Sequence, residues 1–272
     1  MLPATLSLSR LVATVLLTVA TAFLSGQVPR QVYTAKGGTP DTPVPHPLSW
    51  WTQNPLRLDA SGDLMLSRTA PDGHIVTSGD YRIQQKVTYL GSISGHRIVQ
   101  IMTTIEPGPR LVSLGWKSTD IPPTQWKSLL VKTGNEYEEI YRLQSEYGTN
   151  PPLKDAAIYG VGPNAILGTY DRDSGNGGGC DDGYWWFDKA GVHLVDFSPL
   201  AQAIYRVIPK NSGYTPNCWA LHPEKAELKS WVQEGDPKCH ACGGLGMVEA
   251  RYRIEHGIAI PVSVRFKPDE QP

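Results

Sequence analysis

The chain has 272 residues, and its 25 lysines and arginines are balanced by 26 aspartates and glutamates. This balance argues against a nucleic acid or an anionic membrane as partner, because both attract a basic protein surface. Abundant glycine (27), proline (23), tyrosine (12) and tryptophan (8) favour short strands and turns over a helical bundle.

The N-terminus resembles a secretory leader. Arg10 is the only charged residue before an apolar run from Leu11 to Leu24. The run is shorter than the roughly 20 apolar residues of a membrane span, and Ala20-Thr21-Ala22 offers a cleavage site of small residues. We therefore expect residues 1–24 to be a signal peptide of a periplasmic or secreted protein, with no integral membrane domain in the mature chain. An uncleaved anchor is the alternative.

The segment that follows is polar and rich in proline, and we expect residues 25–48 to be an extended linker. Residues 49–148 are expected to form a first β-rich domain or subdomain. Two prolines after Asn150 predict a boundary there, before a second β-rich domain over residues 149–267. Runs typical of strands in the first domain cover residues 63–67, 81–90, 96–105, 110–116, 126–132 and 137–143.

In the second domain we expect hairpins and two short helices. The hairpin strands cover residues 156–159 with 165–170, 184–187 with 192–197, and 248–254 with 258–266; the helices cover 199–207 and 223–232. A three-residue loop, Glu255-His256-Gly257, is expected to close the last hairpin. The predicted fold class is mainly β, with antiparallel sheets arranged as a sandwich or open barrel.

Four cysteines lie in the second domain, and in an exported protein they predict structural disulfides. A Cys-x-x-Cys pair closes a strained ring, so we expect its two members to pair with distant cysteines. Thioredoxin-type chemistry lacks the helix that should follow the pair, and haem attachment lacks the required histidine. A zinc site is the alternative. The residues concerned are Cys180, Cys218, Cys239 and Cys242.

A glycine-rich acidic loop precedes the second tryptophan pair. No cofactor is expected, with Ca²⁺ as the alternative, because oxygen ligands on a flexible loop suit this ion. A solvated turn is the competing interpretation of the loop. The candidate ligands are Asp171, Asp173, Asn176, Asp181 and Asp182.

Aromatic residues follow this loop directly, at Tyr184, Trp185 and Trp186, with Asp188 close behind. Neighbours in a strand face opposite sides, so one tryptophan of the pair should be buried and the other exposed. An exposed tryptophan beside Tyr184 and Asp188 predicts a binding surface for a sugar or peptide, and packing in a core is the alternative.

No sequence motif identifies a catalytic residue, since neither Gly-x-Ser-x-Gly nor His-Glu-x-x-His occurs. We therefore expect an exported, non-catalytic binding or structural module of the cell envelope or exterior, with envelope carbohydrate or protein as partner. One alternative is a secreted hydrolase that uses acidic residues of the glycine-rich loop with a histidine such as His193. The other is a zinc protein that uses the cysteines.

Overall fold

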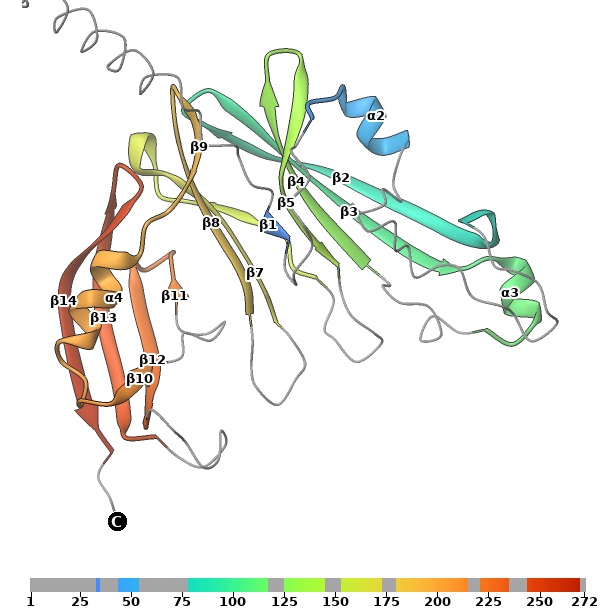
Figure 1. The fold of residues 1–272 in the computed structure, drawn as a ribbon. Helices are drawn as coiled ribbons and strands as arrows, with labels where there is room; N and C mark the ends of the chain where they lie inside the picture. The colour runs from blue at the N-terminus through green and yellow to red at the C-terminus, as the bar shows by residue number, and fades with distance from the viewer. Residues whose placement is uncertain are drawn as a thin grey trace, which may run out of the picture.

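The computed structural model describes residues 33–34, 44–53, 78–116, 125–144, 153–172, 180–214, 221–234 and 244–269. The expected signal peptide and the expected strand over residues 63–67 lie outside these ranges. The described residues form three sheets with a few short helices (Figure 1), so the predicted mainly β fold with antiparallel sheets is confirmed. No helix in this part of the chain is long and apolar enough to cross a membrane.

The N-terminal sheet is curved like half of a barrel and contains the longest hairpin among the described residues (Figure 1). Its strands, in order across the sheet, are β1 (Tyr33–Thr34), β5 (Glu136–Gln144), β4 (Gln125–Thr133), β3 (His96–Pro107) and β2 (Tyr81–Ile93). All neighbours are antiparallel except β1 and β5. Ser94 and Gly95, with φ of 50° and 86°, close the β2–β3 hairpin, and such paired positive φ angles match the twist of the strands.

Helix α2 (Leu48–Gln53) covers part of this sheet through Trp51, which is buried against Val99 and Leu130. The Trp51 indole donates a hydrogen bond to the carbonyl of Tyr137 at 3.0 Å. His46 forms a β-bridge with the same Tyr137, and β1 pairs with β5. Two pieces of the segment expected to be a linker are therefore hydrogen bonded to the sheet.

The prediction of a strand over residues 110–116 is wrong, because helix α3 (Pro109–Ser113) forms there. A second short helix, η1 (Ser78–Asp80), comes directly before β2. Pro109 stands in the first helical turn, where its missing N–H costs nothing. Gly115, with φ of 84°, follows the helix in the left-handed conformation that commonly ends one. Leu111 points into the core beside Ile105.

The middle sheet is built from two hairpins that the sequence predicted. Its strands are β6 (Ala157–Tyr159), β7 (Ile166–Arg172), β8 (Cys180–Asp188) and β9 (Gly191–Leu194), and the one-turn helix η3 (Gly162–Asn164) connects the first two. Strand β8 begins at Cys180, before the expected start at residue 184. It also pairs with β7, from Trp186 opposite Ile166 to Cys180 opposite Arg172, which the sequence did not predict.

The C-terminal sheet packs against helix α4 (Ser198–Tyr205), whose Leu200 and Ile204 are buried. Its strands are β10 (Ser212–Tyr214), β11 (Leu221–His222), β12 (Glu227–Glu234), β13 (Gly246–Glu255) and β14 (Ile258–Pro268). The final hairpin and the first helix are confirmed. The hairpin loop has two residues where three were expected, because Glu255 pairs with Ile258.

The prediction of a helix over residues 223–232 is wrong. Residues 223–226 form a turn that ends at Ala226 with φ of 51°, and the rest is strand β12. Buried Leu228, Ser230 and Val232 alternate with exposed side chains, which is the period of a half-buried strand. Pairing with β13 on one side and β10 on the other stabilises the strand over the local helical preference.

The middle sheet packs on both of its faces. One face joins the N-terminal sheet in a core that contains Leu129, Tyr141, Leu167 and Phe187. The opposite face meets Phe197, in the segment before α4, and residues of the C-terminal sheet. The expected domain boundary falls between residues 144 and 153, outside the described ranges, and the sheets on its two sides share the first core.

A buried lysine crosses this first core. Lys127 on β4 is fully buried, and its Nζ donates hydrogen bonds to Thr169 Oγ1 at 2.5 Å and to the Lys154 carbonyl at 2.9 Å. The ammonium also lies 5.8 Å from the centre of the Tyr141 ring. Burying a cation without hydrogen-bond partners costs folding free energy. The ammonium keeps its partners only when the N-terminal and middle sheets meet in one register.

We predict that Lys127→Ala lowers the free energy of unfolding by about 2 to 4 kcal/mol, because it leaves a cavity and strands the buried acceptors. Urea denaturation followed by tryptophan fluorescence measures this change. Lys229→Ala, an exposed lysine on β12, is the control and should change stability by less than about 0.5 kcal/mol. Equal stability of the two variants would contradict a structural role for the buried ammonium.

Candidate functional site

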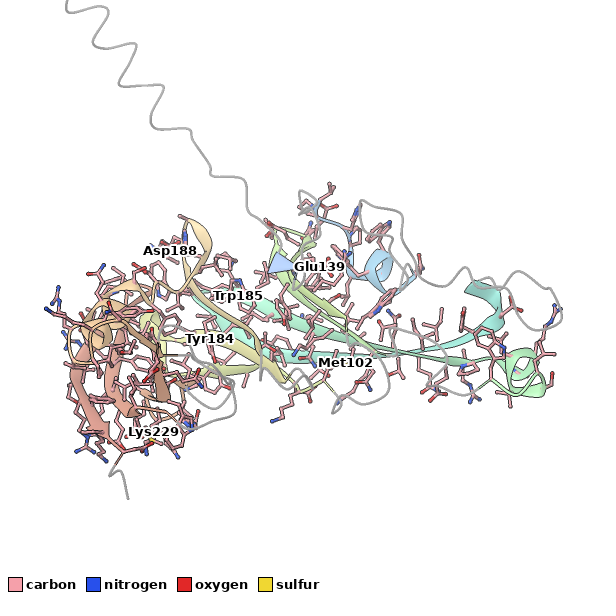
Figure 2. The ribbon with its side chains drawn as sticks, turned by 60° about the horizontal axis from the view of Figure 1, so that its bottom comes forward. Met102, Glu139, Tyr184, Trp185, Asp188 and Lys229 are labelled. Atoms are coloured by element: carbon pink, nitrogen blue, oxygen red, sulfur yellow. The ribbon has the colours of Figure 1, made fainter. Side chains whose placement is uncertain are left out.

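Strand β8 carries the residues expected to bind a ligand and separates them onto two faces. Trp185, with 3% of its surface exposed, lies in the core shared with the N-terminal sheet, where its ring meets Tyr141 edge to face at 5.4 Å. Tyr184, with 7% exposed, packs on the other side against Phe197. Figure 2 labels both residues between the N-terminal sheet and the C-terminal sheet. Neither offers a surface to a ligand.

Two glycines make room for these rings. A Cβ at Gly183 would clash with the ring of Trp185, and a Cβ at Gly168 would approach the Tyr184 ring to 2.9 Å. Gly168 stands directly opposite Tyr184 in the β7–β8 pairing. The aromatic side chains therefore lie over backbone that has no side chain of its own, which fixes their orientation.

Trp186 is the partly exposed member of the pair. Its indole N–H donates a hydrogen bond to the Pro163 carbonyl at 2.8 Å. Its ring lies 5.5 Å from the His193 ring and 6.2 Å from the His256 ring, and a Cβ at Gly257 would come within 3.0 Å of it. Trp186 therefore joins the β8–β9 hairpin to the turn between β13 and β14, and presents only part of its ring to solvent.

Asp188 lies at the tip of the β8–β9 hairpin, as Figure 2 shows. Its Oδ1 accepts hydrogen bonds from His193 Nε2 at 3.0 Å and from the backbone N–H groups of Ala190 and Gly191 at 2.7 and 3.0 Å. The hydrogen bond from His193, followed by those from the backbone, holds the pKa of Asp188 below its usual range. The carboxylate is consequently ionised at neutral pH.

A third element reaches the same hairpin. The main-chain carbonyl of Asp188 accepts a hydrogen bond from His96 Nε2 at 2.9 Å, and the Phe187 carbonyl accepts one from Ser94 Oγ at 2.9 Å. The turn of the β2–β3 hairpin is thus docked on the end of β8. We call the group formed by Asp188, Trp186, His193, His96 and His256 the Asp188 site.

Neither His96 nor His256 was predicted from the sequence as a site residue. Each is next to a turn glycine and far along the chain from Asp188, so no local pattern connects them to it. His193 was named only as a possible partner of loop acids. The structure pairs it with Asp188 because β8 and β9 form a tight hairpin.

The residues predicted to bind calcium are only partly described. The register of β7 and β8 places Asp171 opposite Asp181 and Tyr170 opposite Asp182. Asp181 and Asp182 therefore belong to a strand, not to a flexible loop, while Asp173 and Asn176 lie outside the described ranges. In the part of the chain that is described, no three His, Cys, Asp or Glu residues are grouped to hold a metal ion. Calcium binding stays a prediction.

The cysteines also lie mostly outside the described residues. Cys180 begins β8 opposite Arg172, and the placement of its side chain is not described. Cys218, Cys239 and Cys242 fall in the undescribed segments 215–220 and 235–243. The disulfides and the alternative zinc site therefore stay predictions.

The Asp188 site offers several kinds of contact to a ligand. In the neutral tautomer whose Nε2 donates to the Asp188 carboxylate, Nδ1 of the exposed His193 ring is a hydrogen-bond acceptor. Asp188 contributes negative charge, and the ring of Trp186 contributes apolar surface. No protein-family model matches the chain, and no curated protein matches it either.

We predict that His193→Ala raises the pKa of Asp188 towards its ordinary value of 3.8, because the largest cause of the lowering is removed. A carboxylate with a lowered folded pKa stabilises the protein above the unfolded pKa, and this stabilisation disappears as the pH falls through the folded value. The stability difference between variant and wild type should therefore shrink below about pH 4. Carbon NMR titration of the Asp188 carboxyl measures the pKa directly.

The control for this titration is His222→Ala, which removes the imidazole of another surface pair, His222 with Glu224 at 3.4 Å. It should leave the Asp188 titration unchanged. An unchanged pKa of Asp188 in His193→Ala would show that the His193 hydrogen bond does not form in solution.

Proposed function

We propose that this protein is an exported, non-catalytic binding module of the cell envelope or exterior, and that the Asp188 site contacts its ligand. The observation that carries the proposal is the juxtaposition of a partly exposed Trp186 with an exposed imidazole and an ionised carboxylate. Three hairpins, β2–β3, β8–β9 and β13–β14, hold these groups. A site on such a frame loses little conformational entropy on binding.

The state of Asp188 favours binding over acid catalysis. A general acid needs a raised pKa, whereas the pKa of Asp188 is lowered. Oδ1 already accepts three hydrogen bonds, which positions the carboxylate as a fixed negative group. Fixed polar groups beside an aromatic ring are what an orientation-specific binding surface requires.

Envelope carbohydrate is the ligand class that best fits this combination. A sugar has apolar ring faces, which suit the exposed part of Trp186, and hydroxyl groups, which suit the His193 acceptor and the Asp188 carboxylate. A protein ligand would also find aromatic and charged contacts here. The ligand class is therefore the first property to test.

A secreted hydrolase is the second candidate, and one observation favours it. The hydrogen bond from His193 Nε2 to Asp188 orients the imidazole as in a general base. Such a base needs a nucleophile, and in the described part of the chain no Ser, Thr or Cys side chain is hydrogen bonded to His193. An activated water would have to take that role.

We predict that the protein co-sediments with insoluble peptidoglycan, and that the double variant Asp188→Asn, His193→Ala binds at least about 10-fold more weakly. The loss of hydrogen bonds to a charged group accounts for this factor. His222→Ala is the matched control and should bind like wild type. Equal binding of all three proteins would contradict a role for the Asp188 site, and release of soluble sugar fragments by wild type alone would favour the hydrolase.

A measurement of the intact mass of the purified protein tests export and disulfide formation together. We predict that protein recovered from the secreted or periplasmic fraction lacks residues 1–24. Two disulfides among its four cysteines would make its denatured mass four hydrogens lower than that of the reduced chain, and no thiol should react with iodoacetamide before reduction. A retained leader would contradict cleavage. A native mass increased by one zinc, with four reactive thiols after denaturation, would replace the disulfides by a metal site.

A further inference from the structure

The outer face of the C-terminal sheet carries a compact group of cations around a tryptophan. Two rows of cross-strand neighbours run over β12, β13 and β14 in the register of the sheet. The first row is Lys229, Glu249 and Arg265, and the second is Trp231, Met247 and Lys267. We call these six residues the Trp231 patch.

The charges of the patch do not cancel. It holds three cations and one anion, a net charge of +2. Glu249 pairs with both Arg265 at 2.5 Å and Lys267 at 2.8 Å. The Glu249 side chain is 17% exposed, against 68% and 52% for its two partners, so the positive groups stand outermost. Lys229 forms no ion pair within the described residues.

Packing inside the protein does not account for this surface. The opposite face of the sheet is buried against α4, and contains Leu228, Val232 and Val248. Trp231 points away from that core and is 46% exposed. Cross-strand ion pairs around Glu249 contribute to sheet stability, but they need neither Lys229 nor an exposed tryptophan.

We propose that the Trp231 patch docks the protein on an anionic phospholipid surface. Lysine and arginine side chains near such a surface are each attracted by about 1 kcal/mol, and tryptophan prefers the boundary between headgroups and acyl chains. The patch is one face of a sheet and its cations are on long exposed side chains, which suits an extended charged surface more than a single small anion that needs enclosing walls.

The near-neutral charge of the chain does not oppose this docking. Charges interact strongly only within a Debye length of about 8 to 10 Å at physiological salt, so the local surplus is what the membrane senses. Lys229 lies well away from Asp188 in Figure 2, and β12 lies away from the tip of the β8–β9 hairpin in Figure 1. Docking through the patch therefore leaves the Asp188 site accessible to a ligand.

Vesicle co-sedimentation of the full chain tests the proposal. Wild type should bind vesicles of phosphatidylcholine with phosphatidylglycerol, bind pure phosphatidylcholine much more weakly, and dissociate as salt is raised. Lys229→Gln with Arg265→Gln should lower the partition coefficient about 20- to 30-fold, since two cations are lost. Trp231→Ala should lower it as well, and Lys229→Arg with Arg265→Lys should bind like wild type.

Matched controls separate the patch from other contributions. Lys189→Gln with Lys210→Gln removes the same charge from exposed positions elsewhere, and should reduce binding by far less than the patch variant. All variants carry the same N-terminal segment, so differences in binding between variants report the substituted side chains. Circular dichroism confirms that each variant is folded.

Three results would overturn the proposal. They are equal binding to both vesicle types, equal loss in the patch and control variants, and absence of vesicle binding by wild type. Binding of soluble polygalacturonate in place of vesicles, with the same sensitivity to Lys229 and Arg265, would assign the patch to an acidic polysaccharide.

Discussion

The architecture depends on one strand that is buried on both faces. Along β8, Trp185 and Phe187 fill the core against the N-terminal sheet, while Tyr184 and Trp186 face the C-terminal sheet and the segment before α4. A strand sends successive side chains to opposite faces, so four consecutive aromatic residues bind two partners at once. The middle sheet is for this reason the element through which the other two sheets are held together.

The Asp188 site follows from the place where β8 ends. Two turns from other sheets reach the end of the strand, because the sheets that carry them pack on its two faces. The β2–β3 turn contacts it through Ser94 and His96, and the β13–β14 turn contacts Trp186. Tight turns expose polar side chains while their backbones stay fixed. The same packing that stabilises the core thus gathers histidines that are distant in the chain.

Polar groups restrict how the sheets combine. Lys127 is fully buried and is satisfied by Thr169 and the Lys154 carbonyl, which belong to the other side of the first core. Gln100 adds a second polar connection, because its side chain accepts a hydrogen bond from the Ala156 N–H at 2.8 Å. Apolar contacts tolerate small shifts, whereas these hydrogen bonds do not, so the buried polar groups select one register between the sheets.

Local patterns in the sequence determined most strands and their hairpins, because the alternation of apolar and polar residues and the choice of turn residues act between near neighbours. The hairpin of β13 and β14 with its His256-Gly257 turn is an example. These local patterns gave the wrong element at β12, where pairing with neighbouring strands opposed the local helical preference. They also gave the wrong element at α3, where a proline and a glycine enclose a short helix. Alternation also predicted that Trp185 and Trp186 face opposite sides. Only the tertiary structure decided that both sides of β8 pack against other sheets while Trp186 stays partly exposed. It also decided that His96 and His256 join Asp188, and that a nearly neutral chain presents a cationic Trp231 patch. Each of these depends on contacts between residues far apart in the chain, and such contacts leave no periodic trace in the sequence.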